Sequence, residues 1–150
     1  MNLPKNILVP IDFSPFSEQA LDYAVALATK LDAKVHLLNV VGFPVMGGPE
    51  LGVTMIASVI DQLTKDNQSA LAKLVDARRS SGTIGEVMLR TGDARDLILR
   101  ACEEVNADLI VMGTHGRRGV TRALLGSVAE SVVRTAPCPV MTIRAQKGTK

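Results

Sequence analysis

Apolar residues are spaced along the chain with two alternating periods, which predict strands and helices in turn. Short apolar runs typical of strands buried on both faces occupy residues 6–10, 34–41, 86–90, 108–112 and 140–143. Between these runs, apolar residues recur at helical spacing, as Leu21, Ala28 and Leu31 do in the first interval. The pattern predicts a strand at each end of the chain and a helix between each pair of consecutive strands.

Capping residues place the ends of the predicted helices. Ser14 followed by Pro15 is typical of an N-cap and the first residue of a helix. Asp93 is expected to cap the third helix, with Asp96 three residues later as in a capping box. The second helix is predicted at residues 54–79. It follows a stretch at residues 42–52, rich in glycine and proline, which either closes over a ligand or simply connects two elements.

This alternation predicts an α/β fold, a doubly wound, mostly parallel five-stranded sheet with helices on both faces. For the strand order 3-2-1-4-5, the winding direction reverses between the first and fourth strands, and ligands bind beyond the carboxyl ends of strands at such a point. The segments leaving those two ends begin at Pro10 and Gly113. At 150 residues the chain is expected to form a single domain, 1–150.

Composition narrows the classes of function. Apolar residues make up 47% of the chain and aromatic residues only 3%, so the core is expected to consist of aliphatic side chains without platforms for base stacking. The formal net charge is +2, and the basic residues are scattered, which argues against nucleic acid as a partner. The amino terminus lacks the apolar region of a secretory signal, and no stretch approaches the ~20 apolar residues of a membrane span. The chain is therefore predicted to be cytoplasmic, without a membrane partner.

Two cysteines and one histidine are expected to have structural roles. Cys102 falls in a helical pattern and Cys138 lies between two prolines, without C-x-x-C spacing, so both are expected to be reduced and unpaired. His36 lies within a predicted strand, flanked by apolar residues, and is expected to be a hydrogen-bonded core residue.

The glycine motif after the fourth strand carries the most specific signal for function. It reads Gly113-Thr114-His115-Gly116, then nine residues, then Gly126-Ser127 at the start of a helix. Exposed backbone N–H groups, the Ser127 hydroxyl and the positive end of the helix dipole together favour an anion such as phosphate. Glycines between a strand and a helix are also common as plain turn residues. No lysine follows as in a P-loop, and the spacing is not that of G-x-G-x-x-G.

The motif G-x2-G-x9-G-S, together with VPIDFS after the first strand, resembles the universal stress protein family over residues 5–144. The resemblance is to the single-domain, nucleotide-binding branch, and it implies a Rossmann-like fold that binds ATP or AMP, with Mg²⁺ accompanying ATP. It does not distinguish ATP, ADP and AMP.

The resemblance also assigns roles to residues. It implies that Pro10, Ile11 and Asp12 lie against adenine and ribose, and that Val40 offers backbone groups to the adenine edge. The remaining implied ligand-binding residues lie in or beside the glycine motif: Met112, Gly113, His115, Gly116, Arg117, Gly126, Ser127 and Val128. Asp12 has an alternative role in capping the turn before Ser14, and His115 has one as a solvated loop residue.

The function favoured is a nucleotide-binding sensor or regulator of the stress response with at most slow hydrolysis. Asp12 is the one carboxylate in the site, whereas phosphoryl transfer uses several charged groups around the phosphates. The alternatives are an ATP-using enzyme and an interaction module without nucleotide. A homodimer through the apolar edge strand Val140–Ile143 is also expected, unless the carboxyl-terminal tail or a helix covers that edge.

Overall fold

A computed structural model describes residues 2–43, 52–115 and 125–144 of the chain. These residues form nine main elements and one short 3-10 helix, in the order β1 (Asn6–Ile11), α1 (Pro15–Leu31), β2 (Lys34–Val41), α2 (Val53–Asp76), η1 (Arg79–Ser81), β3 (Ile84–Thr91), α3 (Ala94–Glu104), β4 (Leu109–Gly113), α4 (Ser127–Thr135) and β5 (Val140–Ile143).

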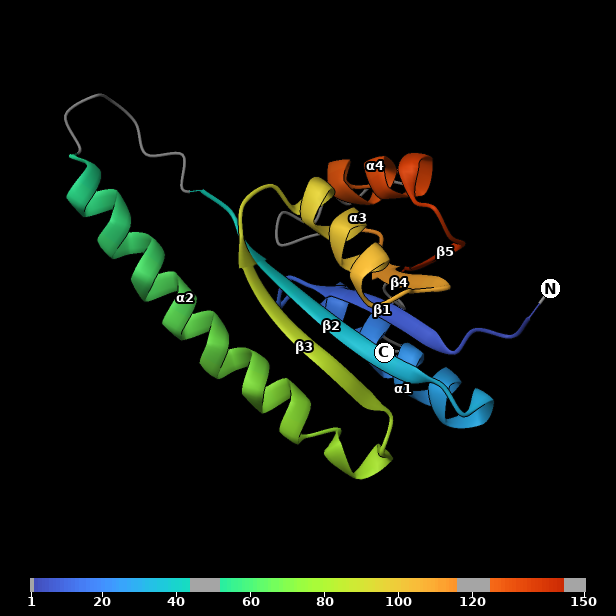
Figure 1. Ribbon diagram of the computed structural model, residues 1–150. Coiled ribbons are helices and arrows are strands. Elements are labelled where there is room, and N and C mark those ends of the chain that lie inside the picture. Colours follow the sequence, from blue (N-terminus) through green and yellow to red (C-terminus); the bar gives the residue numbers. More distant parts are fainter. Residues whose placement is uncertain (1, 44–51, 116–124, 145–150) are drawn as a thin grey trace, which may run out of the picture.

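The five strands form one sheet in the order β3-β2-β1-β4-β5, and all four strand pairings are parallel (Figure 1). This confirms the predicted strand order and the doubly wound fold. β1 lies at the centre, with Ile7 opposite Val35 of β2 on one side and Leu109 of β4 on the other. The winding direction therefore reverses between β1 and β4, and the sheet places the carboxyl ends of these strands next to each other.

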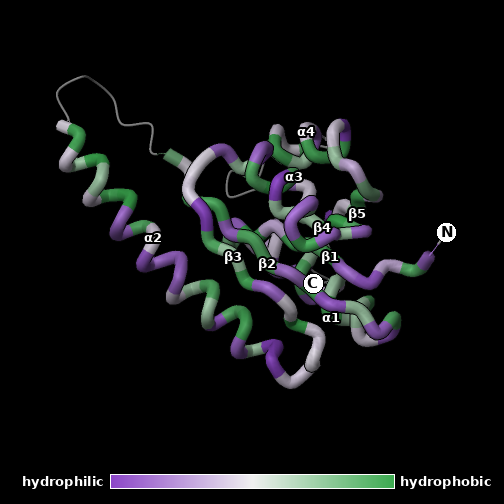
Figure 2. Tube along the Cα trace, in the orientation of Figure 1, coloured by the Kyte–Doolittle hydropathy of each residue, from purple (hydrophilic) through white to green (hydrophobic). Residues whose placement is uncertain are grey.

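Helices cover both faces of the sheet, and side chains alternate between the two faces. In β1, Ile7 and Val9 belong to the core beneath α1 and α2, whereas Leu8 belongs to the core beneath α3 and α4. β4 alternates in the same way, with Val111 on the first face and Ile110 on the second. Figure 2 shows the apolar colouring concentrated along the central strands. A strand buried on both faces needs a nearly continuous apolar run, which is why these strands could be predicted.

The helix caps follow the predictions, but several element boundaries differ from them, most by one residue and those of α2 and β3 by more. The Ser14 side chain accepts a hydrogen bond from Ser17 N–H, and the Asp93 side chain accepts one from Arg95 N–H. The second helix ends at Asp76 rather than at residue 79, because the chain then forms a 3-10 turn closed by Gly82 at φ 67°. β3 is also longer than predicted, since its polar and half-exposed residues still pair with β2.

His36 is buried in the sheet with both ring nitrogens in hydrogen bonds, as expected for a structural histidine. Nδ1 accepts from the N–H of Glu86 at 3.0 Å, and Nε2 lies 3.2 Å from Asn6 Oδ1. The ring also explains why residue 85 is a glycine, because a Cβ at that position would lie 2.8 Å from the ring carbon Cε1 of His36. Since Nδ1 is an acceptor, this arrangement requires the neutral ring.

We expect acid to destabilise the fold through His36. Burial lowers the pKa of His36, and the nearby Glu86 carboxylate opposes this only in part. The unfolded chain then binds the proton more readily than the folded chain. The contribution of the neutral His36 ring to the free energy of unfolding is therefore fully present above the unfolded pKa of 6.5 and falls as the pH drops below it. The loss is at most about 1.4 kcal/mol per pH unit. Urea unfolding across this range should show a smaller pH dependence for His36→Gln than for the parent, and equal slopes would contradict the assignment.

None of the described helices has both the length and the apolar composition needed to cross a lipid bilayer.

Candidate functional site

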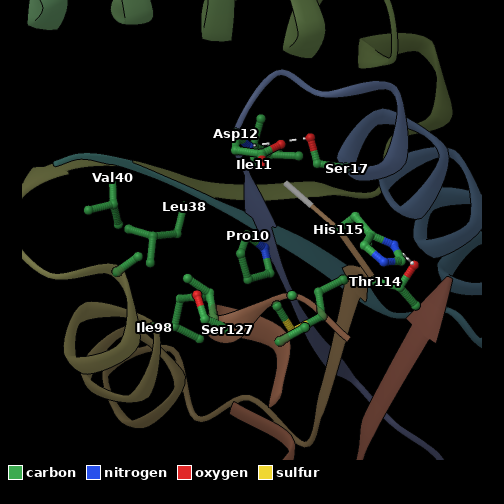
Figure 3. A pocket seen from close by; sticks show the side chains of 16 residues that line it. Pro10, Ile11, Asp12, Ser17, Leu38, Val40, Ile98, Thr114, His115 and Ser127 are labelled. Atoms are coloured by element: carbon green, nitrogen blue, oxygen red, sulfur yellow. Dashed lines mark hydrogen bonds between the residues drawn. The ribbon is translucent and has the colours of Figure 1, made fainter. Parts of the chain in front are cut away.

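A cavity of about 410 Å³ lies at the carboxyl edge of the sheet, where the winding direction reverses between β1 and β4. Its walls come from the ends of β1, β2 and β4 and from the amino-terminal turns of α1, α3 and α4 (Figure 3). The described residues that line it are Pro10, Ile11, Asp12, Ser17, Leu38, Val40, Ala94, Ile98, Met112, Gly113, Thr114, His115, Gly126, Ser127, Val128 and Ala129.

The turn after β1 supplies a carboxylate to the cavity, and the first turn of α1 supplies a hydroxyl. Asp12 Oδ1 accepts a hydrogen bond from Ser14 N–H at 2.9 Å, and Asp12 N–H donates to Ser17 Oγ at 3.3 Å. Phe13, between Asp12 and Ser14, has a φ of 62°, an uncommon value for a bulky residue. The turn is therefore held in a sparsely populated conformation. The alternative role of Asp12, capping this turn, is therefore confirmed for one of its oxygens. Asp12 also lines the cavity, and its predicted role toward a ribose is compatible with the cap.

The end of β4 lies unusually close to α1. A Cβ on Gly113 would lie 2.8 Å from Phe16 Cβ and 2.9 Å from the Phe16 carbonyl carbon, so the close packing of strand and helix requires glycine here. The next residue, Thr114, places its Oγ1 at 2.9 Å from His115 Nδ1. Gly113 thus has a packing role in addition to its position in the cavity wall.

His115 is packed into the wall of the cavity. Its ring centroid lies 5.6 Å from that of Phe16, with the two rings tilted by 50°. Its Nε2 is buried and has no hydrogen-bond partner within residues 2–43, 52–115 and 125–144. His115 as a whole is partly exposed, so its ring is only in part removed from solvent. In Figure 3, His115 and Thr114 lie on the opposite side of the cavity from Val40 and Leu38.

The amino terminus of α4 opens onto the same cavity. Its N-cap is Gly126, which has no side chain to cap the helix, and Gly126 N–H donates to the carbonyl of Thr114 at 2.7 Å. The N–H groups of Ser127, Val128 and Ala129 have no carbonyl partner within the helix, because an α-helix leaves the donors of its first turn unpaired. These three residues line the cavity, so the positive end of the helix dipole adjoins it.

The opposite part of the cavity is apolar. Leu38 and Val40 contribute from β2, and Ala94 and Ile98 contribute from α3. Such a wall favours an aromatic or aliphatic group, because burying apolar surface away from water is favourable, while the helix terminus favours an anion. The arrangement can therefore hold a ligand with one apolar ring system and one negatively charged end.

The structure brings together ten of the twelve residues predicted for ligand binding. Pro10, Ile11, Asp12, Val40, Met112, Gly113, His115, Gly126, Ser127 and Val128 all line the cavity. Gly116 and Arg117 lie outside the described residues, as does most of the predicted loop after β2. That the ten residues contact a ligand stays a prediction.

Six further lining residues were not predicted from the sequence: Ser17, Leu38, Ala94, Ile98, Thr114 and Ala129. Thr114 and Ala129 adjoin predicted residues and could have been included with them. Ser17 could have been predicted, since it follows the N-cap of α1 by three residues and so lies in the first helical turn beside the sheet edge. Ala94 and Ile98 carry no local signal, because only the packing of α3 against β2 places them here.

The sheet order and the position of the cavity define a class of protein, the doubly wound α/β domains with a ligand site at the switch point. The family model described as the universal stress protein family matches residues 4–144, and the chain therefore belongs to that family.

Individual relatives agree with this assignment. The chain is 37% identical over 147 residues to a universal stress protein of Methanocaldococcus jannaschii, covering 97% of this chain and 85% of that one. The solved universal stress protein UspA from Lactobacillus plantarum superposes with a TM-score of 0.83 at 26% identity, covering 93% of this chain and 97% of the other. A universal stress protein from Archaeoglobus fulgidus, solved in complex with dAMP, matches with a TM-score of 0.62 at 26% identity, covering 93% and 97%.

Proposed function

We propose that this chain binds an adenine nucleotide, ATP or AMP, in the cavity between β1 and β4. In this proposal it acts in the cytoplasm as a sensor or regulator of a stress response, with the bound nucleotide as its signal. The observation that carries the proposal is the open amino terminus of α4 facing the same cavity as the apolar wall of Val40 and Ile98. The dAMP complex of the Archaeoglobus fulgidus relative supports it.

Each part of the nucleotide has a matching group in the cavity. The adenine ring would lie along Val40, Leu38 and Ile98, with backbone polar groups of β2 at its edge. Asp12 would accept hydrogen bonds from the ribose hydroxyls, since one carboxylate can accept several. The phosphates would bind the N–H groups and hydroxyl at the start of α4, with Mg²⁺ as a counterion when ATP is the ligand.

Titration calorimetry with AMP, ADP, ATP and GTP tests the proposal. We expect micromolar dissociation constants for adenine nucleotides, about −8 kcal/mol at 1 µM, and weaker binding of GTP. The absence of any heat or thermal shift with every adenine nucleotide at millimolar concentration would overturn it.

We further propose that any hydrolysis is slow. Asp12 is the one carboxylate among the described residues that line the cavity, and one of its oxygens already holds the turn before α1. Kinases reach about 1–100 s⁻¹ by arranging several charged groups around the transferred phosphoryl group. We expect phosphate release from ATP below about one per minute, far under that range. Sustained release at several per second, lost in Asp12→Asn, would instead place the chain among ATP-using enzymes.

We also propose that two copies pair through β5. This strand is an edge of the sheet, and its four residues Val140–Ile143 are all partly exposed. A two-fold axis can place two such edges antiparallel and satisfy their free backbone groups. Sedimentation equilibrium at tens of micromolar should show a dimer, and Met141→Pro should dissociate it because proline removes a ladder N–H. A single species with the mass of one chain in the parent protein would contradict this assembly.

A further inference from the structure

The only two cysteines of the chain lie against each other, although 36 positions separate them in the sequence. Cys102 is on α3, and Cys138 lies between Pro137 and Pro139 in the segment that leads into β5. Their Sγ atoms are 3.4 Å apart, and both are free thiols. No motif in the sequence indicated this contact.

The separation of the two sulfurs and the partial exposure of one of them allow a bond between them. A disulfide requires about 2.05 Å between the two sulfurs, so the Sγ atoms need to approach by about 1.4 Å. Cys102 is 2% exposed and belongs to the core between the sheet, α3 and α4. Cys138 packs at the edge of this core and is partly exposed. A small reagent therefore reaches Cys138 first.

The two sulfurs also differ in acidity. Burial raises the pKa of Cys138, as does the Asp108 carboxylate, while hydrogen bonds from the Cys102 thiol and from Ile110 N–H oppose the shift. For Cys102, burial raises the pKa to about 12, with further increases from the Cys138 contact and from the charges of Glu103 and Asp108. Both pKa shifts are upward, so the partial exposure of Cys138, rather than a low pKa, makes its sulfur the attacking group.

We propose that Cys102 and Cys138 form a redox-active dithiol site that a small-molecule disulfide such as oxidised glutathione converts to an intramolecular disulfide. The Cys138 thiolate attacks one sulfur of the reagent, forming a mixed disulfide and releasing one glutathione thiolate. Cys102 then loses its proton to solvent and attacks Cys138 Sγ, and the second glutathione leaves as a thiolate. The two protons of the protein thiols end on the two glutathione molecules, so the protein is oxidised by two electrons and the reagent is reduced by two.

The bond would close a loop from Cys102 to Cys138. That loop contains β4, α4 and the cavity residues from Met112 to Ala129. A cross-link that closes a loop of this length restricts the unfolded chain, and we expect the midpoint of thermal unfolding to rise on the order of 10 °C.

The test exposes the 150-residue protein to oxidised glutathione without nucleotide, removes excess reagent and alkylates the remaining thiols before intact-mass analysis. We expect a product that has lost two hydrogen atoms and takes up no alkylating group. It should form about tenfold faster per pH unit between about pH 7 and about pH 9, because the thiolate is the nucleophile. Melting curves before and after reduction of this product measure its stabilisation.

Cys102→Ser and Cys138→Ser are the matched controls, and neither should give the internal disulfide or the stabilisation. Cys102→Ser should instead stop at a glutathione adduct on Cys138. The proposal is overturned if both thiols of the parent remain alkylatable after prolonged oxidation at the higher pH. It is also overturned if the parent yields only stable glutathione adducts or disulfide-linked dimers. None of these outcomes depends on nucleotide binding.

Discussion

Replacing Gly126 with aspartate should lower the affinity for AMP at least about 100-fold, about 2.7 kcal/mol or more, without weakening the fold. Gly126 is the N-cap of α4 and has ordinary backbone angles, φ −61° and ψ 157°, which any residue adopts. An aspartate side chain there would accept hydrogen bonds from the first-turn N–H groups and add a negative charge beside the phosphate position. As aspartate is a better N-cap than glycine, the free energy of unfolding should stay constant or rise by a few tenths of a kcal/mol.

Gly126→Asn is the matched control for this substitution. Asparagine has nearly the same size and also caps the helix, but it carries no charge. We expect a smaller loss of affinity, about tenfold, so the difference between the two variants measures charge repulsion. Calorimetry gives the affinities and urea unfolding gives the stabilities. If Gly126→Asp bound AMP as tightly as the parent while folded, the phosphate position at α4 would be wrong.

Replacing Asp12 with asparagine should lower the affinity for AMP about tenfold, roughly 1.4 kcal/mol, while leaving the turn intact. The Oδ1 atom of asparagine can still accept from Ser14 N–H, as Asp12 does at 2.9 Å. What is lost is the charge that strengthens hydrogen bonds from ribose hydroxyls. Asp12→Ala should lose both functions, with a further destabilisation of about 0.5–1.5 kcal/mol from the missing turn hydrogen bond.

A nucleotide without ribose hydroxyls separates the two roles of Asp12. The 2′,3′-dideoxy analogue of AMP should bind the parent and Asp12→Asn with the same affinity, because it has no group for the carboxylate to accept from. The four affinities, of AMP and its analogue for the parent and for Asp12→Asn, give the coupling free energy between the ribose hydroxyls and the Asp12 side chain. An equal loss for AMP and its dideoxy analogue would show that Asp12 does not contact the ribose.

The fold could be predicted from the sequence because the strands are buried on both faces. Strands such as β2 and β4 consist of nearly uninterrupted apolar residues between helices with clear caps at Ser14 and Asp93. β3 was predicted too short because it is an edge strand whose half-exposed residues do not form an apolar run. The end of α2 was missed because the residues after Asp76 continue into a 3-10 turn that keeps a helical spacing.

The candidate site could be predicted where it lies at the ends of strands or at the start of a helix, and Val40 was assigned by the family resemblance alone. Asp12 and Gly113 could be predicted because they lie at the ends of neighbouring strands, and Ser127 because it begins a helix. Ile98 and the contact between Cys102 and Cys138 depend on how α3 packs on the sheet, which no local pattern encodes. The tight approach of Phe16 to Gly113 likewise gives that glycine a packing reason that the motif alone did not reveal.

A titration of the isotope-labelled protein with AMP, followed by backbone amide NMR, shows whether the nucleotide binds in the cavity between β1 and β4. We expect saturable shifts that are largest at the amides of Ser127, Val128 and Gly113, with smaller changes at Val40. Little change is expected at Gln68 of α2 and Val87 of β3, which line a second hollow between α2 and the sheet. Unchanged amides at Ser127 and Val128 under saturating AMP, or shifts concentrated at Gln68 and Val87, would show that AMP does not bind at the amino terminus of α4.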